Sequence, residues 1–336
     1  MPLVLAPDDD RLAWPGAVSL EHTDEWVKPW RIPHGQCDLF FPDGIGGHAA
    51  EPAGVRIAFR SDTATVTGKT VTFQEQEPQQ IDLCIDGELL ETVDVSGQDG
   101  FRFSGLPVGK KSIELWLPQC GEFRLRQIEM DDRATVEPFE DRRPRWITYG
   151  SSITQCGAAA SPAQTWPGIV AREHGLNLTC LGFGGNCHLE PMIARMIRDL
   201  PADFLSMCVG INILGSGSLS WRSFRPAIIG FVQIIREEHP DAPLAVISPL
   251  YCPEGETTDN AVGLNLQIMR QEVAAAVGAL RDHGDGNIHY IDGLELLGPD
   301  VPHWADLVPD GLHPNAEGYK ALAASFLEKV AAKVFV

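Results

Sequence analysis

The spacing of hydrophobic residues changes at about Arg145, and this change constrains the fold more than any other feature of the sequence. Beyond it, short apolar runs alternate with longer segments whose hydrophobic residues recur at helical spacing. The apolar runs predict strands at 146–149, 178–183, 204–209, 244–248 and 288–291. The longer segments predict helices at 166–174, 190–199, 224–238, 264–280 and 316–334. This alternation predicts a parallel sheet with helices on both faces.

The chain before this point has a different pattern, with alternating residues and no helix-length periodicity. Strands are predicted at 55–60, 64–74, 81–86, 89–96, 111–118 and 123–131, separated by Gly, Pro and Asp. Such a pattern is typical of an antiparallel β-sandwich. A charged stretch with two prolines, 135–145, then predicts a linker. We therefore expect a sandwich domain at 1–134, a linker at 135–145 and an α/β domain at 146–336.

The charge of the chain limits its partners. Asp and Glu number 46 against 26 Lys and Arg, for a formal net charge of −20, which would repel nucleic acid and anionic lipid surfaces. The N-terminus lacks the basic start and sustained apolar core of a secretory signal, so we expect a cytoplasmic protein without a membrane span. The eight scattered cysteines form no Cys-x-x-Cys pair and are expected to be reduced. There is no His-Glu-x-x-His, and Cys187-His188 has no partner pair at zinc-ligand spacing, so no metal is expected.

Loops that follow parallel strands are where chemistry is expected, because ligands bind beyond the carboxyl ends of such strands. Two of these loops follow the first and second strands, and one follows the third. A last loop precedes the C-terminal helix. Each alone is compatible with an ordinary turn or helix cap. Their sequences are YGSSIT at 149–154, GFGGN at 182–186, VGIN at 209–212 and DGLHPN at 310–315.

Together these loops hold the groups that acyl transfer needs. A serine hydroxyl becomes a nucleophile when a histidine takes its proton, and a carboxylate can hold that histidine in the right tautomer. Asp310, three residues before His313, is suitably placed for this. The oxyanion that forms needs preorganised donors, which a glycine N–H and an asparagine amide can supply. A second pair with the same spacing, Asp300 and His303, shows that spacing alone is weak evidence.

The four sequences, in this order, resemble the four blocks of the SGNH (GDSL-type) hydrolase superfamily, over about residues 145–336. The resemblance implies a flavodoxin-like sheet, preceded here by a jelly-roll-like sandwich. It also implies Ser152 as nucleophile, His313 as base and Asp310 as its orienting carboxylate. The backbone N–H groups of Ser152 and Gly185, with the Asn212 side chain, would form the oxyanion hole. The chain departs from the common family pattern at Ser151 and Ile213, where Asp is frequent.

The resemblance implies an enzyme that works through an acyl-Ser152 intermediate, with either water or a hydroxyl as acceptor. We expect an esterase or acyltransferase acting on a small-molecule ester or thioester, with no cofactor and with acyl-CoA as a candidate co-substrate. The two-domain layout is similar to that of carbohydrate esterases and of antibiotic-pathway acyltransferases. A carbohydrate O-acetyl esterase is therefore the alternative, and a carbohydrate-binding protein with a relic SGNH domain is a more distant one. The acyl group, the acceptor and the oligomeric state stay open.

Two loops are expected to select the substrate, because they follow strand ends and mix Gly, Ser or Pro with apolar side chains. They span residues 213–222 and 251–261. Three tryptophans are candidates for the pocket wall, although core packing is the more ordinary role for Trp166. The other two are Trp221 and Trp304.

Overall fold

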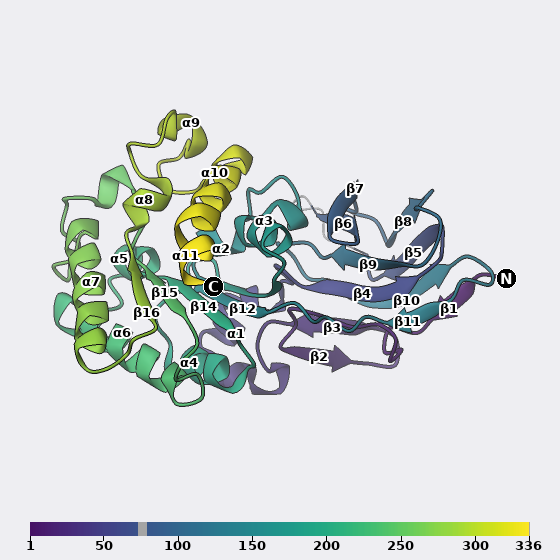
Figure 1. The fold of residues 1–336 in the computed structure, drawn as a ribbon, viewed down its shortest axis with the longest axis horizontal. Coiled ribbons are helices and arrows are strands. Elements are labelled where there is room, and N and C mark those ends of the chain that lie inside the picture. The colour runs from purple at the N-terminus through teal and green to yellow at the C-terminus, as the bar shows by residue number, and fades with distance from the viewer. Residues whose placement is uncertain (73–78, 336) are drawn as a thin grey trace. The chain divides into compact units, whose positions relative to one another are not determined.

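A computed structural model describes residues 1–72 and 79–335 of the chain (Figure 1). These residues form two compact units. The first contains Met1–Arg143 with two short later segments, Ala160–Gln164 and Asn177–Cys180, and the second contains the other residues from Pro144 onward. Each unit is described by itself below.

The first unit holds two antiparallel sheets, as the sequence predicts. One sheet has the order β2-β3-β10-β5-β8, with β1 also paired to β10, and the other has the order β11-β4-β9-β6-β7. The first sheet consists of β1 (Leu3–Leu5), β2 (Ser19–His22), β3 (Val27–Trp30), β5 (Thr65–Thr70), β8 (Gly100–Ser104) and β10 (Leu125–Met130). The second consists of β4 (Arg56–Ser61), β6 (Gln80–Ile85), β7 (Glu88–Asp94), β9 (Lys111–Trp116) and β11 (Val136–Pro138). Short helical turns lie at His34–Leu39, Asp43–Gly46 (α1) and His48–Ala50.

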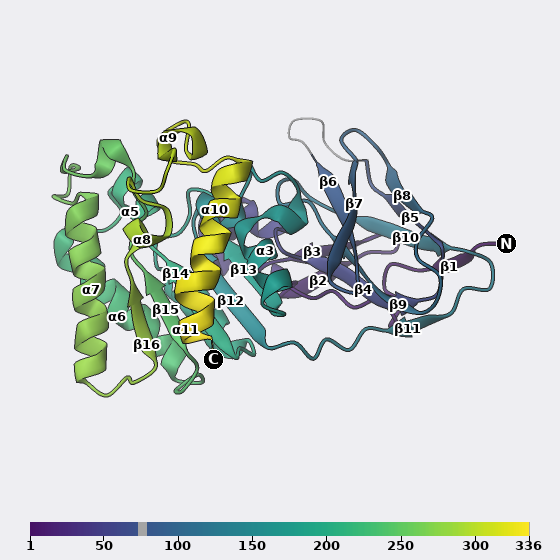
Figure 2. The ribbon, with the colours of Figure 1, turned by 45° about the horizontal axis from the view of Figure 1, so that its top comes forward.

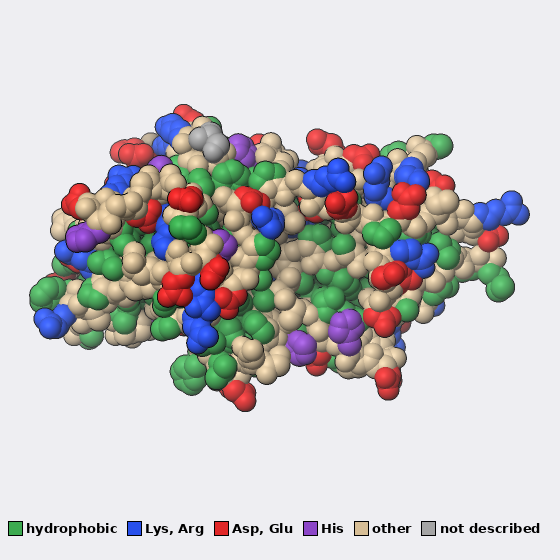
Figure 3. Space-filling model, turned by 60° about the horizontal axis from the view of Figure 1, so that its bottom comes forward, with side chains coloured by type: hydrophobic (Ala, Val, Ile, Leu, Met, Phe, Trp, Pro, Cys, Tyr) green, Lys and Arg blue, Asp and Glu red, His purple; other side chains and the backbone are tan. Residues whose placement is uncertain are grey.

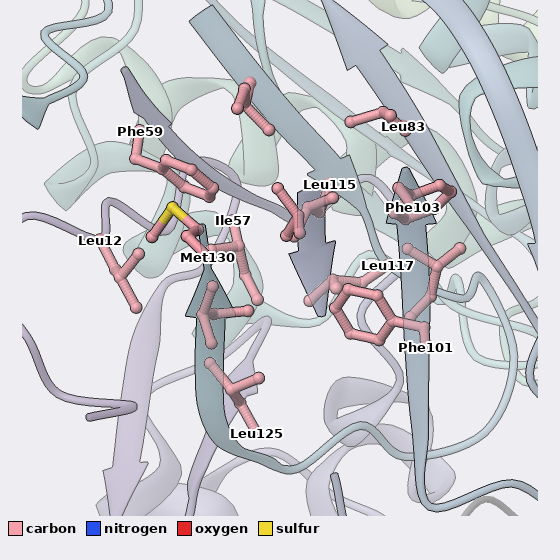
Figure 4. Close-up of a cluster of buried hydrophobic side chains, with 14 of the residues drawn as sticks. Leu12, Ile57, Phe59, Leu83, Phe101, Phe103, Leu115, Leu117, Leu125 and Met130 are labelled. Carbon is pink, nitrogen blue, oxygen red and sulfur yellow. The ribbon is translucent and has the colours of Figure 1, made fainter. Parts of the chain in front are cut away.

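The core of this unit follows from alternation along the strands. In β8, Phe101 and Phe103 are buried while Arg102 and Ser104 are exposed, because successive side chains point to opposite faces of a sheet. Figure 4 shows Phe101 and Phe103 with Leu115, Leu117 and Leu125 in one cluster of buried side chains. Burying so many large apolar side chains stabilises a sandwich at roughly 25 cal/mol per Å² of apolar area.

The first unit also differs from the sequence prediction. The strands β1, β2, β3 and β8 were not predicted, since each is short and none is a long alternating run. The predicted strand at 64–74 ends at Thr70, and its positions 73 and 74 lie outside the described residues. The predicted linker contains β11, whose Val136 pairs with Ser61 of β4. The two prolines favoured a linker in the prediction, but Pro is tolerated at the end of an edge strand such as β11.

The second unit is built on a sheet with the order β13-β12-β14-β15-β16, although Asn177–Cys180 of β13 are grouped with the first unit. Its strands are β12 (Arg145–Gly150), β13 (Asn177–Gly182), β14 (Phe204–Cys208), β15 (Leu244–Ile247) and β16 (Ile288–Ile291). The strands from β12 through β14 and β15 to β16 pair in parallel. Tyr149 lies opposite Met207, and Cys208 lies opposite Ile247, so the carboxyl ends of these strands reach the same sheet edge. This is the flavodoxin-like order that the resemblance implies, with its switch point between β12 and β14.

Helices cover both faces of this sheet (Figures 1 and 2). The helices α3 (Trp166–Glu173) and α10 (Ala316–Phe326) pack together, and α4 (Pro191–Asp199), α6 (Trp221–Arg236) and α7 (Leu266–Asp282) form a second layer. This division follows from right-handed crossovers, because the chain reverses its direction across the sheet after β13. Shorter helices lie at α2 (Ser152–Gln155), α5 (Ile211–Ser216), α8 (Gly293–Leu297), α9 (Trp304–Leu307) and α11 (Ala332–Val334). Single turns lie at Pro162–Gln164 and Pro253–Gly255, and a π-helical turn spans Leu327–Ala331.

Two helix boundaries differ from the predictions for local reasons. The helix predicted from Phe224 begins at Trp221, because Ser220 and Ser223 form a reciprocal capping box before the hydrophobic run starts. The helix predicted to run from 316 to 334 is interrupted after Phe326 by the π-helical turn. Its N-terminal boundary matches the prediction, and Asn315 accepts a hydrogen bond from Gly318 N as the cap.

Charged groups of both signs are scattered over the face shown in Figure 3, and hydrophobic side chains reach the surface between them. All eight cysteines lie in the described part of the chain, and none of them forms a disulfide. Among residues 1–72 and 79–335, no helix is both long and apolar enough to cross a membrane. The same residues contain no group of three or more His, Cys, Asp and Glu side chains arranged to hold a metal ion.

Candidate active site

The turn after β12 places Ser152 at the sheet edge. A Cβ atom on Gly150 would lie 2.2 Å from Thr154 Oγ1, so the chain can turn this tightly only with glycine at that position. Ser151 then adopts an extended conformation and caps α2, its Oγ accepting from Ile153 N at 3.2 Å. Ser152 is the first residue of that helix and is half-buried. The two serines therefore have different surroundings, with Ser151 serving as a buried cap.

Ser152 is hydrogen bonded to a histidine and, through it, to a carboxylate. Ser152 Oγ lies 3.0 Å from His313 Nε2, and His313 Nδ1 lies 2.8 Å from Asp310 Oδ2. A carboxylate can only accept, so Nδ1 carries the ring proton of the neutral imidazole and Nε2 faces the serine with a free lone pair. The structure thus brings together the three residues that the sequence proposed for proton transfer.

The turn before α10 fixes this pair. Asp310 Oδ1 accepts from the backbone N–H groups of Leu312 and His313, at 2.8 and 2.6 Å. Gly311 adopts a φ of +78°, which favours glycine. Partial burial opposes ionisation of Asp310, but hydrogen bonds from the backbone and ring of His313 outweigh it and lower the pKa of the carboxyl. Asp310 therefore stays charged beside the imidazole.

The second Asp-x-x-His pair has a different geometry. His303 adopts a φ of +59° at the start of α9, and its side chain is 82% exposed. Its Nδ1 lies 3.6 Å from Asp306, one turn later on the same helix. The structure thus gives His303 a carboxylate neighbour other than Asp300, the residue that matches it in the sequence pattern.

The loop after β13 carries Gly185, one of the proposed oxyanion donors. Gly185 is exposed, with a φ of +68°. The preceding residue, Gly184, donates its N–H to Gln155 Oε1 at 2.8 Å and accepts from the side chain of Asn186. These bonds tie the loop to α2, on which Ser152 lies.

Asn212 lies near the start of α5 and is tied to the same loop. Its Oδ1 accepts from Cys187 N at 3.1 Å. Because the amide oxygen is occupied there, the Nδ2 group is directed away from that contact and can serve as a donor. Gly210, which precedes this helix with a φ of +131°, lets the chain pass Pro249 closely. Ile213, the family departure beside Asn212, is fully buried.

The strand-end loops meet around a small, mostly apolar cavity. Its volume is about 10 Å³, enough for about one water molecule. It is lined by Ser151, Ile153, Cys208, Val209, Ile211, Pro249, Leu250, Tyr251, Cys252 and Leu312. Both loops proposed for substrate selection, 213–222 and 251–261, begin at or within two residues of a residue that lines this cavity. Of these loops, the one at 251–261 contributes Tyr251 and Cys252 to its wall.

The three tryptophans have three different settings. Trp166 is buried, packs on Trp146 at 5.9 Å and donates its Nε1–H to Ile153 O, which is the core role that was expected. Trp221 is 61% exposed. Trp304 meets Tyr251 edge-on, with ring centroids 4.9 Å apart. Trp166 and Trp304 thus each contact a residue that lines the cavity beside Ser151, Ile153 and Tyr251 respectively.

Sequence analysis missed several polar residues that support the site. Gln155 holds Gly184, and Glu190 accepts from Tyr149 OH and His188 N. None of these residues belongs to a recognisable spacing, since each acts through a contact between separate segments. The one local signal is the sequence Glu190-Pro191, because Pro is frequent in the first turn of a helix.

With this geometry established, comparisons with known proteins assign the family. Residues 144–331 match the GDSL-like lipase/acylhydrolase family, and residues 12–126 match the N-terminal domain of SsfX3. The chain belongs to the GDSL-like lipase/acylhydrolase family. It is an enzyme of the SGNH esterase and acyltransferase type, so the interpretation as a relic binding protein is set aside. The activity of such enzymes is acyl transfer or ester hydrolysis.

Solved structures similar to this chain share both of its parts. A salicylyl-acyltransferase, SsfX3, from a tetracycline biosynthetic pathway is 38% identical, with a TM-score of 0.91 over 98% of this chain and 97% of that one. A GDSL-like lipase from Bacteroides ovatus is 21% identical, with a TM-score of 0.79 over 99% and 98%. A family two carbohydrate esterase from Cellvibrio japonicus is 12% identical, with a TM-score of 0.65 over 99% and 98%. The last two show likeness of fold alone. No curated protein matches the chain.

Proposed function

We propose that this enzyme is an acyltransferase that carries the acyl group on Ser152 and passes it from a thioester to the hydroxyl of a small molecule. The observation that carries this proposal is the hydrogen-bonded series Ser152, His313 and Asp310, at 3.0 and 2.8 Å. The 38% identity to a salicylyl-acyltransferase over nearly the whole of both chains favours transfer over hydrolysis. An aromatic acyl group is therefore the first donor to test.

The geometry supports a two-step reaction. His313 Nε2 accepts the proton of Ser152 as Oγ attacks the thioester carbonyl carbon, and Gly185 N–H and the Asn212 amide would stabilise the oxyanion. The C–S bond then breaks, and the imidazolium returns the proton to the leaving thiolate. In the second step His313 takes the proton of the acceptor hydroxyl, whose oxygen attacks the acyl-serine. Release of the ester restores Ser152 when the imidazolium protonates Oγ.

No cofactor is proposed, because His313 moves every proton in this scheme. The negative charge on the oxyanion is stabilised by hydrogen-bond donors of the chain. Acyl-CoA enters only as a co-substrate that supplies the acyl group. The proposed partners are a small-molecule thioester or ester and a small-molecule hydroxyl acceptor. Hydrolysis is the alternative, in which water replaces the acceptor, as in the carbohydrate esterases that share the fold.

The test is to incubate the protein with a salicylyl thioester without acceptor and to measure its mass. We expect the mass to increase by one acyl group in the wild type and in Ser151→Ala, and to stay unchanged in Ser152→Ala. Adding hydroxyl acceptors should then discharge the acyl-enzyme faster than water does. Acylation of Ser152→Ala but not of Ser151→Ala would overturn the assignment, and discharge by water alone would favour the esterase.

Ser151→Ala is a suitable matched control for this test. It removes the same hydroxyl from the neighbouring residue, but that hydroxyl accepts from Ile153 N as a helix cap. The variant should lose about 1 kcal/mol of stability and keep its activity.

A further inference from the structure

A half-buried carboxylate lies behind the proposed oxyanion hole, and the reaction above does not use it. Glu190 directly precedes α4 and ends the loop 183–190, which carries Gly185. Its Oε2 accepts from Tyr149 OH at 2.6 Å and its Oε1 accepts from His188 N at 3.0 Å. One side chain thus joins the strand before the nucleophile to the loop of the oxyanion donor.

Tyr149 completes this connection from the other side. It lies in β12, directly before Gly150, and its buried ring stacks on Phe231 at 5.1 Å. Its hydroxyl donates to Glu190 and also accepts from Leu189 N, at 3.0 Å. The hydroxyl thus both donates a hydrogen bond to the loop and accepts one from it. The rigid ring fixes the position of the loop relative to β12.

The backbone of the loop is in a conformation that needs such support. Leu189 has a φ of +63°, a region that residues other than Gly, Asn and Asp seldom occupy. The N–H of Leu189 donates to Tyr149 OH. The residue before it, His188, donates its N–H to Glu190, and the residue after it is Glu190 itself. Strained residues persist where the surrounding contacts over-determine them, and they concentrate at functional sites.

His188 carries the restraint on to Gly185. Its Nε2 lies 2.9 Å from Gly185 O, and its Nδ1 lies 2.8 Å from Ser218 Oγ. The carbonyl requires a donor, so Nε2 carries the proton of the neutral ring and Nδ1 accepts from the Ser218 hydroxyl. The next residue, Cys187, gives its N–H to Asn212 Oδ1. Two of the three proposed oxyanion donors, Gly185 N–H and the Asn212 amide, are therefore held by the segment that Glu190 anchors.

A carboxylate at this position is costly to maintain. Burial raises the pKa of Glu190, against hydrogen bonds from Tyr149 and from the backbone of His188 that favour the ionised form. Burying a carboxylate is tolerated only where hydrogen bonds satisfy it. Capping α4 does not explain this carboxylate, because Glu190 makes no side-chain cap bond to that helix.

We propose that Glu190 is a positioning residue for the oxyanion hole, acting with Tyr149 to hold Gly185 N–H and the Asn212 amide in their reactive placement. The inference rests on the proposed function, since it takes the oxyanion hole as given. It predicts that Glu190 affects the rate only through the donors of that hole. A residue that merely stabilised the fold would leave the rate of the folded enzyme unchanged.

The experiment is a double-mutant cycle on kcat/KM for a p-nitrophenyl ester, run on full-length protein well below each variant's Tm. Losing one oxyanion donor costs about 10²- to 10³-fold, so Asn212→Ala sets the scale. We expect Glu190→Ala to lose about 10- to 100-fold in kcat with KM nearly unchanged, and to lose clearly less when Asn212 is already Ala, because Gly185 N–H is then the one donor of this pair left to displace. Equal losses in both backgrounds would overturn the proposal.

Conservative variants keep the proposal testable if Glu190→Ala fails to fold. Glu190→Gln keeps one acceptor for His188 N, and Tyr149→Phe removes only the hydroxyl. Both should fall between Glu190→Ala and the wild type in kcat. Wild-type rates in both, at normal folding, would contradict the role of Glu190.

A matched control removes a buried carboxylate elsewhere. Asp285 forms a buried ion pair with Arg236 and precedes β16, at the amino ends of the strands. Asp285→Asn should lower Tm without changing kcat.

Failure of the proposed function is recognised separately. In that case Ser152→Ala would stay active, whatever the effect of replacing Glu190. If Asn212→Ala has wild-type rates, the oxyanion assignment fails and this proposal falls with it.

Discussion

Two segments of this chain, 300–303 and 310–313, contain the same Asp-x-x-His spacing and have different structures. In the second, Asp310 accepts from the ring and backbone of His313, and the ring reaches Ser152. In the first, His303 opens α9 and lies beside Asp306. The two residues between the members of each pair differ, since Gly311 follows Asp310 with a φ of +78°, whereas Val301 and Pro302 separate Asp300 from His303 and proline cannot adopt a positive φ. The spacing of Asp and His identifies candidate pairs, and the backbone conformation between the two residues decides which pair can serve as base and orienting carboxylate.

Replacing the two histidines tests this difference most strongly. His313→Ala should lose about 10⁴- to 10⁶-fold in kcat/KM, because the serine then has no base. His303→Ala should stay within about twofold of the wild type, since its side chain is 82% exposed and lies near Asp306. Ester hydrolysis kinetics measure both. If His303→Ala is the inactive variant, the two segments have been assigned the wrong way round.

Replacing the two carboxylates should have the next largest effect. Asp310→Asn should lose about 10³- to 10⁴-fold in kcat, because an amide can hold the ring in the wrong tautomer. The matched change Asp306→Asn removes the carboxylate near His303 and should leave kcat unchanged. Steady-state kinetics on folded protein check both. A wild-type rate in Asp310→Asn would mean that His313 needs no orienting carboxylate.

The dependence of rate on pH distinguishes the two members of the active pair. On acidification, kcat/KM should fall by about tenfold per pH unit, because the reaction needs a single free base. Asp310 should not add a second proton to this loss, because hydrogen bonds from His313 lower its pKa. His303→Ala should keep the same profile. If kcat/KM of the wild type falls with two protonations and not one, Asp310 is protonated as well.

The smallest effect should come from the residue that holds the segment behind His313. Asn315 caps α10 through Gly318 N, and its Nδ2 donates to Asp306 O. Asn315→Ala should lower the free energy of unfolding by about 1 kcal/mol. Its kcat should fall by roughly tenfold at most, because His313 would be less well placed. Thermal unfolding and kinetics report the two effects, and unchanged values in both would exclude Asn315 as a support.

Local sequence signals predicted the α/β unit better than the sandwich. The strand 288–291 matches β16, and Asn315 caps the last helix as expected. In the sandwich, β8 and the edge strand β11 were missed, because a short strand is stabilised by partners far away in sequence. The alternation of Phe101 and Phe103 with Arg102 was present, but over too few residues to distinguish it from a turn.

The sequence by itself determined the order of the main elements in the α/β unit, the four loops and the residues that can move a proton or stabilise an oxyanion. These depend on local periodicity and on residue type, which the chain displays directly. The family resemblance already named His313 as the base, and the tertiary structure placed its ring beside Ser152 and showed Ser151 to be a cap. Only the tertiary structure brought Glu190 to Tyr149 behind the loop of Gly185. Such contacts join segments that are separate in sequence, and their geometry depends on how the strands end side by side.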